Sequence, residues 1–187
     1  MLLNICTAGD PVLRKQARAL SQEEILSPAI QELVKNMRET MWRAPGVGLA
    51  APQIGESLQL AVLEGRPQFH KKMNEAEVKE WQSTPYDYLA IFNPKIELLP
   101  AHVSAYEGCL SIPGFMASVP RSQSVRVTCL NEKAEPQVIE AEGWFARILQ
   151  HEIDHLNGVL YIDRMESGTF TTIEHYKQYV APPVTPS

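Results

Sequence analysis

Residues 143–158 read GWFARILQHEIDHLNG and are the most informative stretch of this 187-residue sequence. We expect a helix from about Gly143 to Asn157, and because its apolar side chains lie on more than one side, the helix should be buried. Gly158 stands where a glycine commonly ends a helix. A buried helix needs other elements packed around it, and the preceding residues must supply them.

The preceding residues contain one clear helix and several strand patterns. Ser27 is expected to cap the helix, Pro28 to begin it, and Pro45-Gly46 to end it. Short strand patterns in the middle of the chain and helices near both ends favour an α+β fold over a doubly wound sheet. The strand patterns cover residues 58–63, 89–99, 125–129 and 138–140, and a polar surface excursion covers 64–88.

The composition is typical of one packed domain. The chain is 44% hydrophobic with a net charge of −5, which makes nucleic acid and anionic membranes poor partners. No apolar stretch approaches the roughly 20 residues that span a bilayer, and the first residues lack the pattern of a secretory signal or a transit peptide. Three cysteines do not suggest a disulfide framework, so we expect a cytoplasmic location, or an organelle interior for a processed chain.

His151 and His155 give the strongest chemical signal. Residues four apart on a helix differ by only about 40° around its axis, so both imidazoles can bind one metal ion. Glu152 lies beside that face, where it can reach a water molecule in the site. The alternative is a chance match on an ordinary helix.

A catalytic metal site usually has three protein ligands and one open position, so a third ligand is needed. Tyr161 occupies the place of the third histidine of metzincin proteases. Glu166 and Glu174 are candidates without a supporting pattern. Cys109, within EGCLS at 107–111, is the better candidate because a glycine and a turn-like context surround it. The alternative for Cys109 is a small buried apolar residue.

Residues 46–55 read GVGLAAPQIG. They contain the G-x-G-x-x-A pattern of dinucleotide-binding proteins, but they follow a helix instead of a strand, so we reject that interpretation. The small residues instead indicate a backbone that lies close to a neighbouring strand or a ligand. Gln53 is a polar side chain in this apolar segment, either for a structural hydrogen bond or for a contact in a site.

Three segments together resemble motifs of the peptide deformylase family, in the same order. They are GVGLAAPQ at 46–53, EGCLS at 107–111 and HEIDH at 151–155. Within that family, residues 143–150 look most like the class that includes organellar members and some bacterial ones. Met116 stands where many bacterial relatives have an arginine, so we expect details of the substrate pocket to differ from theirs.

The resemblance implies a fold and an activity. The implied fold is α+β, with antiparallel β-sheets packed around the buried helix that carries both histidines. A single catalytic domain would cover 1–166, and a partly disordered C-terminal extension would cover 167–187. The implied activity is removal of the N-terminal formyl group from formyl-methionyl nascent polypeptides. The implied partners are therefore nascent chains at the ribosome, and short formylated peptides would serve as test substrates.

The resemblance also implies residue roles. One divalent metal ion would bind per chain, Fe²⁺ being favoured and Zn²⁺, Ni²⁺ or Co²⁺ able to substitute. Glu152 would be the general acid/base, and Gln53 with the backbone N–H of Leu110 would stabilise an oxyanion. The implied metal ligands are Cys109, His151 and His155.

We expect the methionine side chain of the substrate to enter an apolar pocket. Trp144 and Ile148 precede His151 by about two turns and one turn, which places them near the site. Plain core packing is the alternative for Trp144. The expected substrate-binding residues are Gly46, Val47, Gly48, Trp144 and Ile148, with Gly48 pairing with the substrate backbone.

A carboxylate beside a metal-binding thiolate needs a compensating charge. Arg121 is the first cation after Glu107 in the sequence, so we expect an ion pair that positions the loop of Cys109. Two independent solvated charges are the alternative.

Two other functions compete with the implied one. They are an HExxH zinc metallopeptidase and a non-catalytic metal-binding module, and the presence of Glu152 and Gln53 argues against the module. The sequence does not choose between a monomer and a homodimer.

Overall fold

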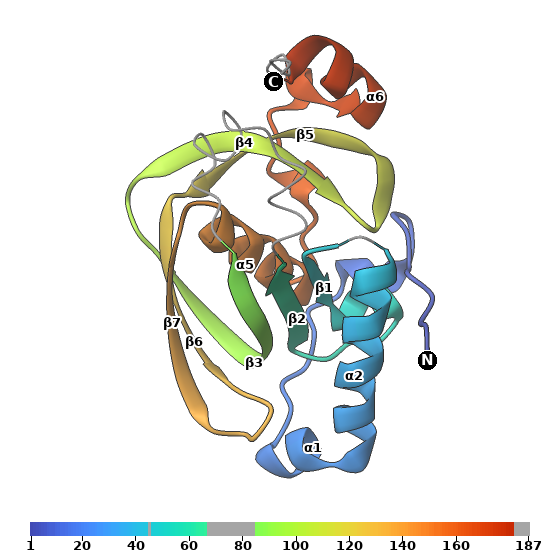
Figure 1. Cartoon of the computed structure of the whole chain (residues 1–187), viewed down its shortest axis with the longest axis vertical. Helices are drawn as coiled ribbons and strands as arrows, with labels where there is room; N and C mark the ends of the chain where they lie inside the picture. The colour runs from blue at the N-terminus through green and yellow to red at the C-terminus, as the bar shows by residue number, and fades with distance from the viewer. Residues whose placement is uncertain (45, 67–84, 182–187) are drawn as a thin grey trace.

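Helix α5 (Gly143–Leu156) packs against strands of two antiparallel sheets in the computed structural model, which describes residues 1–44, 46–66 and 85–181 (Figure 1). Every residue from 146 to 156 is buried, which confirms the expectation of a buried helix. Gly158 follows with a φ of +73°, a left-handed conformation that glycine adopts without strain.

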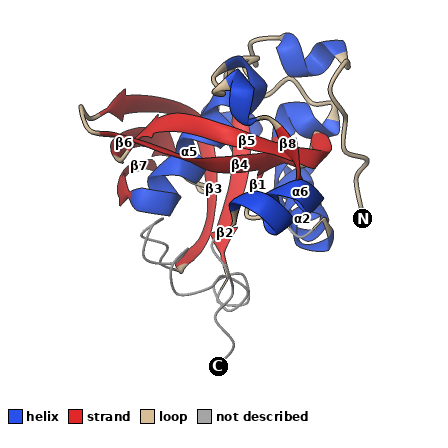
Figure 2. Ribbon diagram, turned by 90° about the horizontal axis from the view of Figure 1, so that it is seen from above, coloured by secondary structure: helices blue, strands red, loops and turns tan. Residues whose placement is uncertain are grey.

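The strands form a five-stranded sheet in the order β1-β2-β3-β6-β7 and a three-stranded sheet in the order β4-β5-β8. Figure 2 shows β4 and β5 crossing over the strands of the larger sheet. All hydrogen-bonded neighbours within the two sheets are antiparallel, so the predicted α+β class is confirmed. The strands are β1 (Gly48–Ala50), β2 (Leu60–Gly65), β3 (Tyr86–Leu98), β4 (His102–Cys109), β5 (Ile112–Ser122), β6 (Ser124–Leu130), β7 (Pro136–Glu142) and β8 (Thr171–Thr172).

The helices other than α5 lie toward the two ends of the chain. The predicted N-terminal helix is α2 (Pro28–Arg43), with Ser27 as its N-cap and Pro28 at its first position. Its predicted end at Pro45-Gly46 cannot be followed in full, because Pro45 lies outside the described residues. The remaining helical elements are η1 (Pro11–Arg14), α1 (Gln22–Leu26), η2 (Ala51–Ile54), η3 (Tyr161–Asp163), η4 (Ser167–Thr169), α6 (Ile173–His175) and η5 (Tyr176–Val180).

Two apolar clusters hold the helices on the larger sheet. On one side, Leu149 and Ile153 of α5 pack with Val127 of β6 and its neighbours. On the other side, Met37 and Met41 of α2 belong to a cluster with residues of β1, β2 and β3. The helix that carries the candidate metal ligands is therefore fixed by the core of the protein.

The structure corrects the expected strand lengths. Strand β2 begins at Leu60 instead of Leu58, and β3 has 13 residues and β5 has 11, so the central strands are not short. The pair of β4 and β5 was not predicted, because Pro113, Gly114 and Pro120 in β5 are residues that usually interrupt strands. The alternating pattern at 125–129 is confirmed as β6, paired with β7.

Two expectations fall largely outside the described residues. The polar excursion was predicted over 64–88, and residues 67–84 of it are not described. Its two ends were predicted wrongly, because β2 continues to Gly65 and β3 begins at Tyr86. The expected disordered tail includes 182–187, which are not described either. Among the described residues, no helix is both long enough and apolar enough to cross a membrane.

Candidate metal centre and active-site pocket

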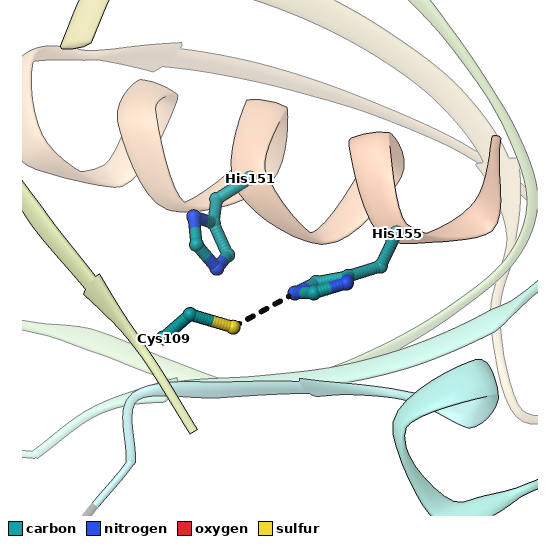
Figure 3. Close-up of side chains that lie close together, drawn as sticks. All are labelled: Cys109, His151 and His155. Atoms are coloured by element: carbon teal, nitrogen blue, oxygen red, sulfur yellow. Dashed lines mark hydrogen bonds between the residues drawn. The ribbon is translucent and has the colours of Figure 1, made fainter. Parts of the chain in front are cut away.

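Cys109, His151 and His155 converge at the inner face of α5. Figure 3 shows both imidazoles projecting from the helix toward Cys109, which lies at the end of β4. The potential ligand atoms all lie within 4.8 Å of one another, and the Cys109 Sγ is 3.3 Å from Nε2 of His155. Three such donors around one tetrahedral ion are roughly 3.5 Å apart, given metal–ligand bonds of about 2.0–2.3 Å.

The chemistry of this donor set also fits a metal ion. One thiolate and two imidazoles suit zinc or iron, and three protein ligands leave a position open. Burial, together with the charge of His151, lowers the pKa of His155 well below its usual range, which favours the neutral form that binds metals. Burial would lower the pKa of His151 too, but its interactions with Cys109 and Glu107 outweigh burial and raise that pKa. A metal ion binds the neutral form of an imidazole, so metal binding competes with protonation of His151.

Glu107 connects the hairpin of Cys109 to α5. Its carboxylate accepts two hydrogen bonds from Arg121, at 2.9 and 3.0 Å, so the predicted ion pair is confirmed. It also accepts a bond of 2.8 Å from Arg147 and lies 3.0 Å from Nδ1 of His151. Arg121 in turn donates to Asp154 of α5. Such a partner on the second ring nitrogen fixes the orientation of a metal-binding histidine.

The Glu107 network is almost completely shielded from solvent. Glu107 and Arg121 are each 4% exposed, and Arg147 is 5% exposed. Burial alone would raise the pKa of Glu107, but hydrogen bonds with His151 and Arg121 outweigh burial and hold that pKa well below its usual range. Glu107 therefore stays ionised beside His151.

Arg121→Met is expected to weaken metal retention by about 10- to 100-fold, the usual effect of losing a partner that orients a ligand. Adding Glu107→Gln should add little further loss, because the two residues act as one unit. The measurement is metal loss to a chelator for both single variants and the double variant. Arg126→Met is the control, since Arg126 forms an exposed pair with Glu140. Strictly additive losses would show that Glu107 and Arg121 are not coupled.

Glu152 lies in the same site but outside the group of three ligands. It is 4% exposed, and its Oε2 atom has no hydrogen-bond partner among the described residues. Burial raises the pKa of Glu152 from its ordinary value to about 7, so it can both accept and release a proton near neutrality. Gly48 explains how the carboxylate fits, because a Cβ atom on Gly48 would lie only 2.2 Å from the Glu152 Oε1.

Gln53 points its amide nitrogen into the site. Its Oε1 accepts a hydrogen bond of 2.8 Å from the backbone N–H of Ala50, which fixes the amide plane. Its Nε2 lies 3.2 Å from the Ser111 hydroxyl and 3.6 Å from the Cys109 Sγ. Gln53 is only 2% exposed, so its N–H donors are held in place next to the candidate ligands.

A pocket of about 440 Å³ opens over this centre. Every residue predicted to act in the site borders the pocket, except His155, which is 1% exposed. The predicted residues at the pocket are Gly46, Val47, Gly48, Gln53, Cys109, Leu110, Trp144, Ile148, His151 and Glu152.

Sequence reasoning missed other residues of the site. Arg147 and Asp154 complete the Glu107–Arg121 network, and Ser111 contacts Gln53. Arg147 had a detectable signal, because it lies four residues before His151 and so shares its helix face. Phe115 and Ile173 also line the pocket. No local sequence pattern indicates this position, because it depends on the long-range pairing of β5 with β8.

The sequence model described as "Polypeptide deformylase" matches residues 2–170 of the chain. The chain belongs to the polypeptide deformylase family. The predicted resemblance is confirmed, and the metallopeptidase and non-catalytic alternatives receive no support from the family match.

Named deformylases from organelles and bacteria are similar to this chain. Peptide deformylase 1A, chloroplastic, from Solanum lycopersicum is 43% identical over 92% of this chain, which spans only 62% of that relative. The mitochondrial peptide deformylase of Homo sapiens is 37% identical, over 91% of this chain and 70% of the relative. The Met-ala-ser-bound structure of the class I type b peptide deformylase from Acinetobacter baumannii aligns with a TM-score of 0.79 and 31% identity, over 88% of this chain and 99% of that chain.

Proposed function

We propose that this chain hydrolyses the N-terminal formyl group of formyl-methionyl polypeptides and releases formate. The observation that carries the proposal is the convergence of Cys109, His151 and His155 with Glu152 on one pocket, in a chain of the deformylase family. A related deformylase has been crystallised with Met-ala-ser bound, which has the sequence of a product peptide.

The proposed ligands are Cys109, His151 and His155, which would hold one divalent ion. The ion would supply Lewis-acid chemistry and lower the pKa of water from 15.7 toward 7. We propose Fe²⁺ as the favoured ion, with Zn²⁺, Ni²⁺ or Co²⁺ able to substitute. Because Zn²⁺ binds such donors more tightly than Fe²⁺, loading with Fe²⁺ depends on metal availability.

Glu152 carries the proton through the proposed reaction. Its carboxylate accepts a proton from the attacking water as the water oxygen bonds to the formyl carbon. The Nε2–H of Gln53 and the backbone N–H of Leu110 donate to the carbonyl oxygen as negative charge develops there. Glu152 then gives the proton to the amine nitrogen, the C–N bond breaks, and formate and the free amino terminus leave.

The substrate chain would lie along β1. This strand is at the edge of its sheet and pairs with β2 on one side, which leaves Gly48 available to pair with the substrate backbone. The methionine side chain would contact Val47 and Ile148, with Gly46 beside them in the pocket wall. Nascent chains at the ribosome, in the cytoplasm or an organelle, are the proposed source of substrate.

Three matched peptides test the proposed function: formyl-Met-Ala-Ser, acetyl-Met-Ala-Ser and unmodified Met-Ala-Ser. We expect formate and free Met-Ala-Ser from the first peptide alone, because an acetyl group adds a methyl to the carbonyl that the site must hold. Formate is measured by an enzymatic assay, and the peptides are followed by mass spectrometry. Cleavage of the Met-Ala bond without formate release would favour a peptidase instead.

Trp144→Ala is expected to raise KM for formyl-methionyl peptides more than it lowers kcat. Trp144 borders the pocket two turns before His151, so it would contact the bound side chain and not the reacting bond. Initial-rate kinetics of the variant check the result, with Trp42→Ala as the control because Trp42 is 39% exposed on α2. Unchanged kinetics with a lower Tm would mean that Trp144 serves only in packing.

A further inference from the structure

A second cavity, of about 200 Å³, lies on the other side of α5 from the active-site pocket. Gln150 and Asp154 border this cavity, whereas Ile148 and Glu152 border the pocket, and the two pairs point from opposite faces of the helix. Arg164 also borders the cavity, with a side chain that is 48% exposed. Small ions in the solvent therefore reach the cavity at Arg164.

Arg164 is the outer end of a series of ion pairs that leads to the metal centre. It donates two hydrogen bonds to Asp154, from Nε at 2.7 Å and from Nη2 at 2.8 Å. Asp154 accepts another from Arg121, and Arg121 donates two to Glu107. Glu107 lies 3.0 Å from Nδ1 of His151, which completes what we call the ion-pair series. Arg164 is its one exposed member, since the other four residues are buried.

The turn after α5 fixes the position of Arg164. Its backbone N–H donates to the carbonyl of Tyr161 at 3.0 Å, and the backbone N–H of Leu160 donates to the Asp163 carboxylate at 2.8 Å. Tyr161 is 1% exposed, so this turn is anchored in the core. The turn brings Arg164 back to α5, where it meets Asp154 ten residues earlier in the sequence.

The balance of charge along the series gives Arg164 a role beyond an ordinary surface pair. Asp154 lies between two guanidinium groups, so its attraction is divided between Arg121 and Arg164. Without Arg164, Asp154 would face Arg121 alone and draw it away from Glu107. Attraction between buried charges is screened much less than attraction between exposed ones, so this pull would be felt at Glu107.

We propose that Arg164 is a positioning residue of the metal centre. By sharing Asp154 with Arg121, it keeps the Arg121 guanidinium on Glu107, and Glu107 in turn keeps His151 oriented for metal binding. An isolated exposed ion pair contributes little, but this pair continues inward through buried partners to a metal ligand. The inference rests on the proposed function through its ligand set.

Arg164→Ala tests the inference in the metal-loaded protein. The rate of metal loss to a chelator should rise by about 3- to 10-fold, less than for Arg121→Met because Arg164 is one ion pair further from the ligand. Arg164→Lys should restore the rate only in part, because lysine keeps the charge but lacks the two-pronged geometry. Arg18→Ala is the matched control, since Arg18 forms an exposed pair of 2.9 Å with Glu24, outside the series.

Guanidinium ion separates positioning from a general loss of stability. In Arg164→Ala the cavity leaves room beside Asp154, so millimolar guanidinium should occupy the vacated position and slow metal loss toward the rate of the unchanged protein. Sodium chloride at the same concentration is the salt control, because salt alone screens exposed charges. Guanidinium destabilises folded proteins, so it would not rescue a variant that was merely less stable.

The outcomes separate this inference from the proposed function. If Arg164→Ala loses metal at the unchanged rate, or loses it faster without responding to guanidinium, the inference is wrong and the proposed function stands. If the unchanged protein binds no divalent ion and releases no formate from formyl-Met-Ala-Ser, the proposed function fails and the inference fails with it.

Discussion

Glu152→Ala is expected to lower kcat for formate release by about 100- to 10,000-fold and to leave one metal ion bound per chain. This range is typical of removing a general acid or base. Glu152 is not in the group of three ligands, so metal binding should not depend on it. Burial raises the pKa of the Glu152 carboxylate to about 7. This carboxylate can therefore take a proton from the attacking water and return it to the leaving amine.

Two further variants sharpen the test of Glu152. Glu152→Gln keeps the size of the side chain but cannot carry the proton, so it should lose as much activity as the alanine variant. Glu56→Ala is the control, since Glu56 is an exposed glutamate outside the pocket. If Glu152→Ala lost its metal and regained full activity when metal was added back, the role of Glu152 would be structural.

Cys109→Ala is expected to reduce metal affinity by more than about 100-fold, beyond the effect of losing a residue that only orients a ligand. Two imidazoles from α5 would remain, and they leave the ion under-coordinated. Formate release should fall in parallel with metal content. Elemental analysis of the purified variant, together with competition against a chelator, provides the measurement.

Cys129→Ala is the matched control for Cys109→Ala. Cys129 is also a free cysteine, but it is 7% exposed in the core cluster around β6. Its replacement should lower stability by removing packed atoms and should leave metal content unchanged. Full metal retention by Cys109→Ala would mean that the third ligand lies elsewhere.

The sequence predicts the helical part of the site well because helical spacing is a local property. His151 and His155 share a helix face by geometry alone, and Ile148 and Trp144 follow from the same spacing. The helix caps at Ser27 and Gly158 are local too, and the structure has both.

The contributions of β4 and β5 could not be predicted in the same way. Cys109 was a candidate on local context, but its distance to the histidines depends on long-range pairing in the sheets. Strand β5 was not predicted because it contains Pro113, Gly114 and Pro120, residue types that usually interrupt strands. Without β5, nothing in the sequence placed Phe115 or Ile173 at the pocket. The Glu107–Arg121 pair was predicted from charge, but its extension to Arg147 and Asp154 requires the packing of α5 on the hairpin.

Formate release from formyl-Met-Ala-Ser, measured while a divalent metal ion is titrated into metal-free protein, tests the proposed site most directly. The three-ligand site predicts activity that rises linearly and saturates at one ion per chain, with Glu152→Ala binding the same amount of metal and remaining inactive. Formate release by the metal-free protein in the presence of a chelator would contradict it.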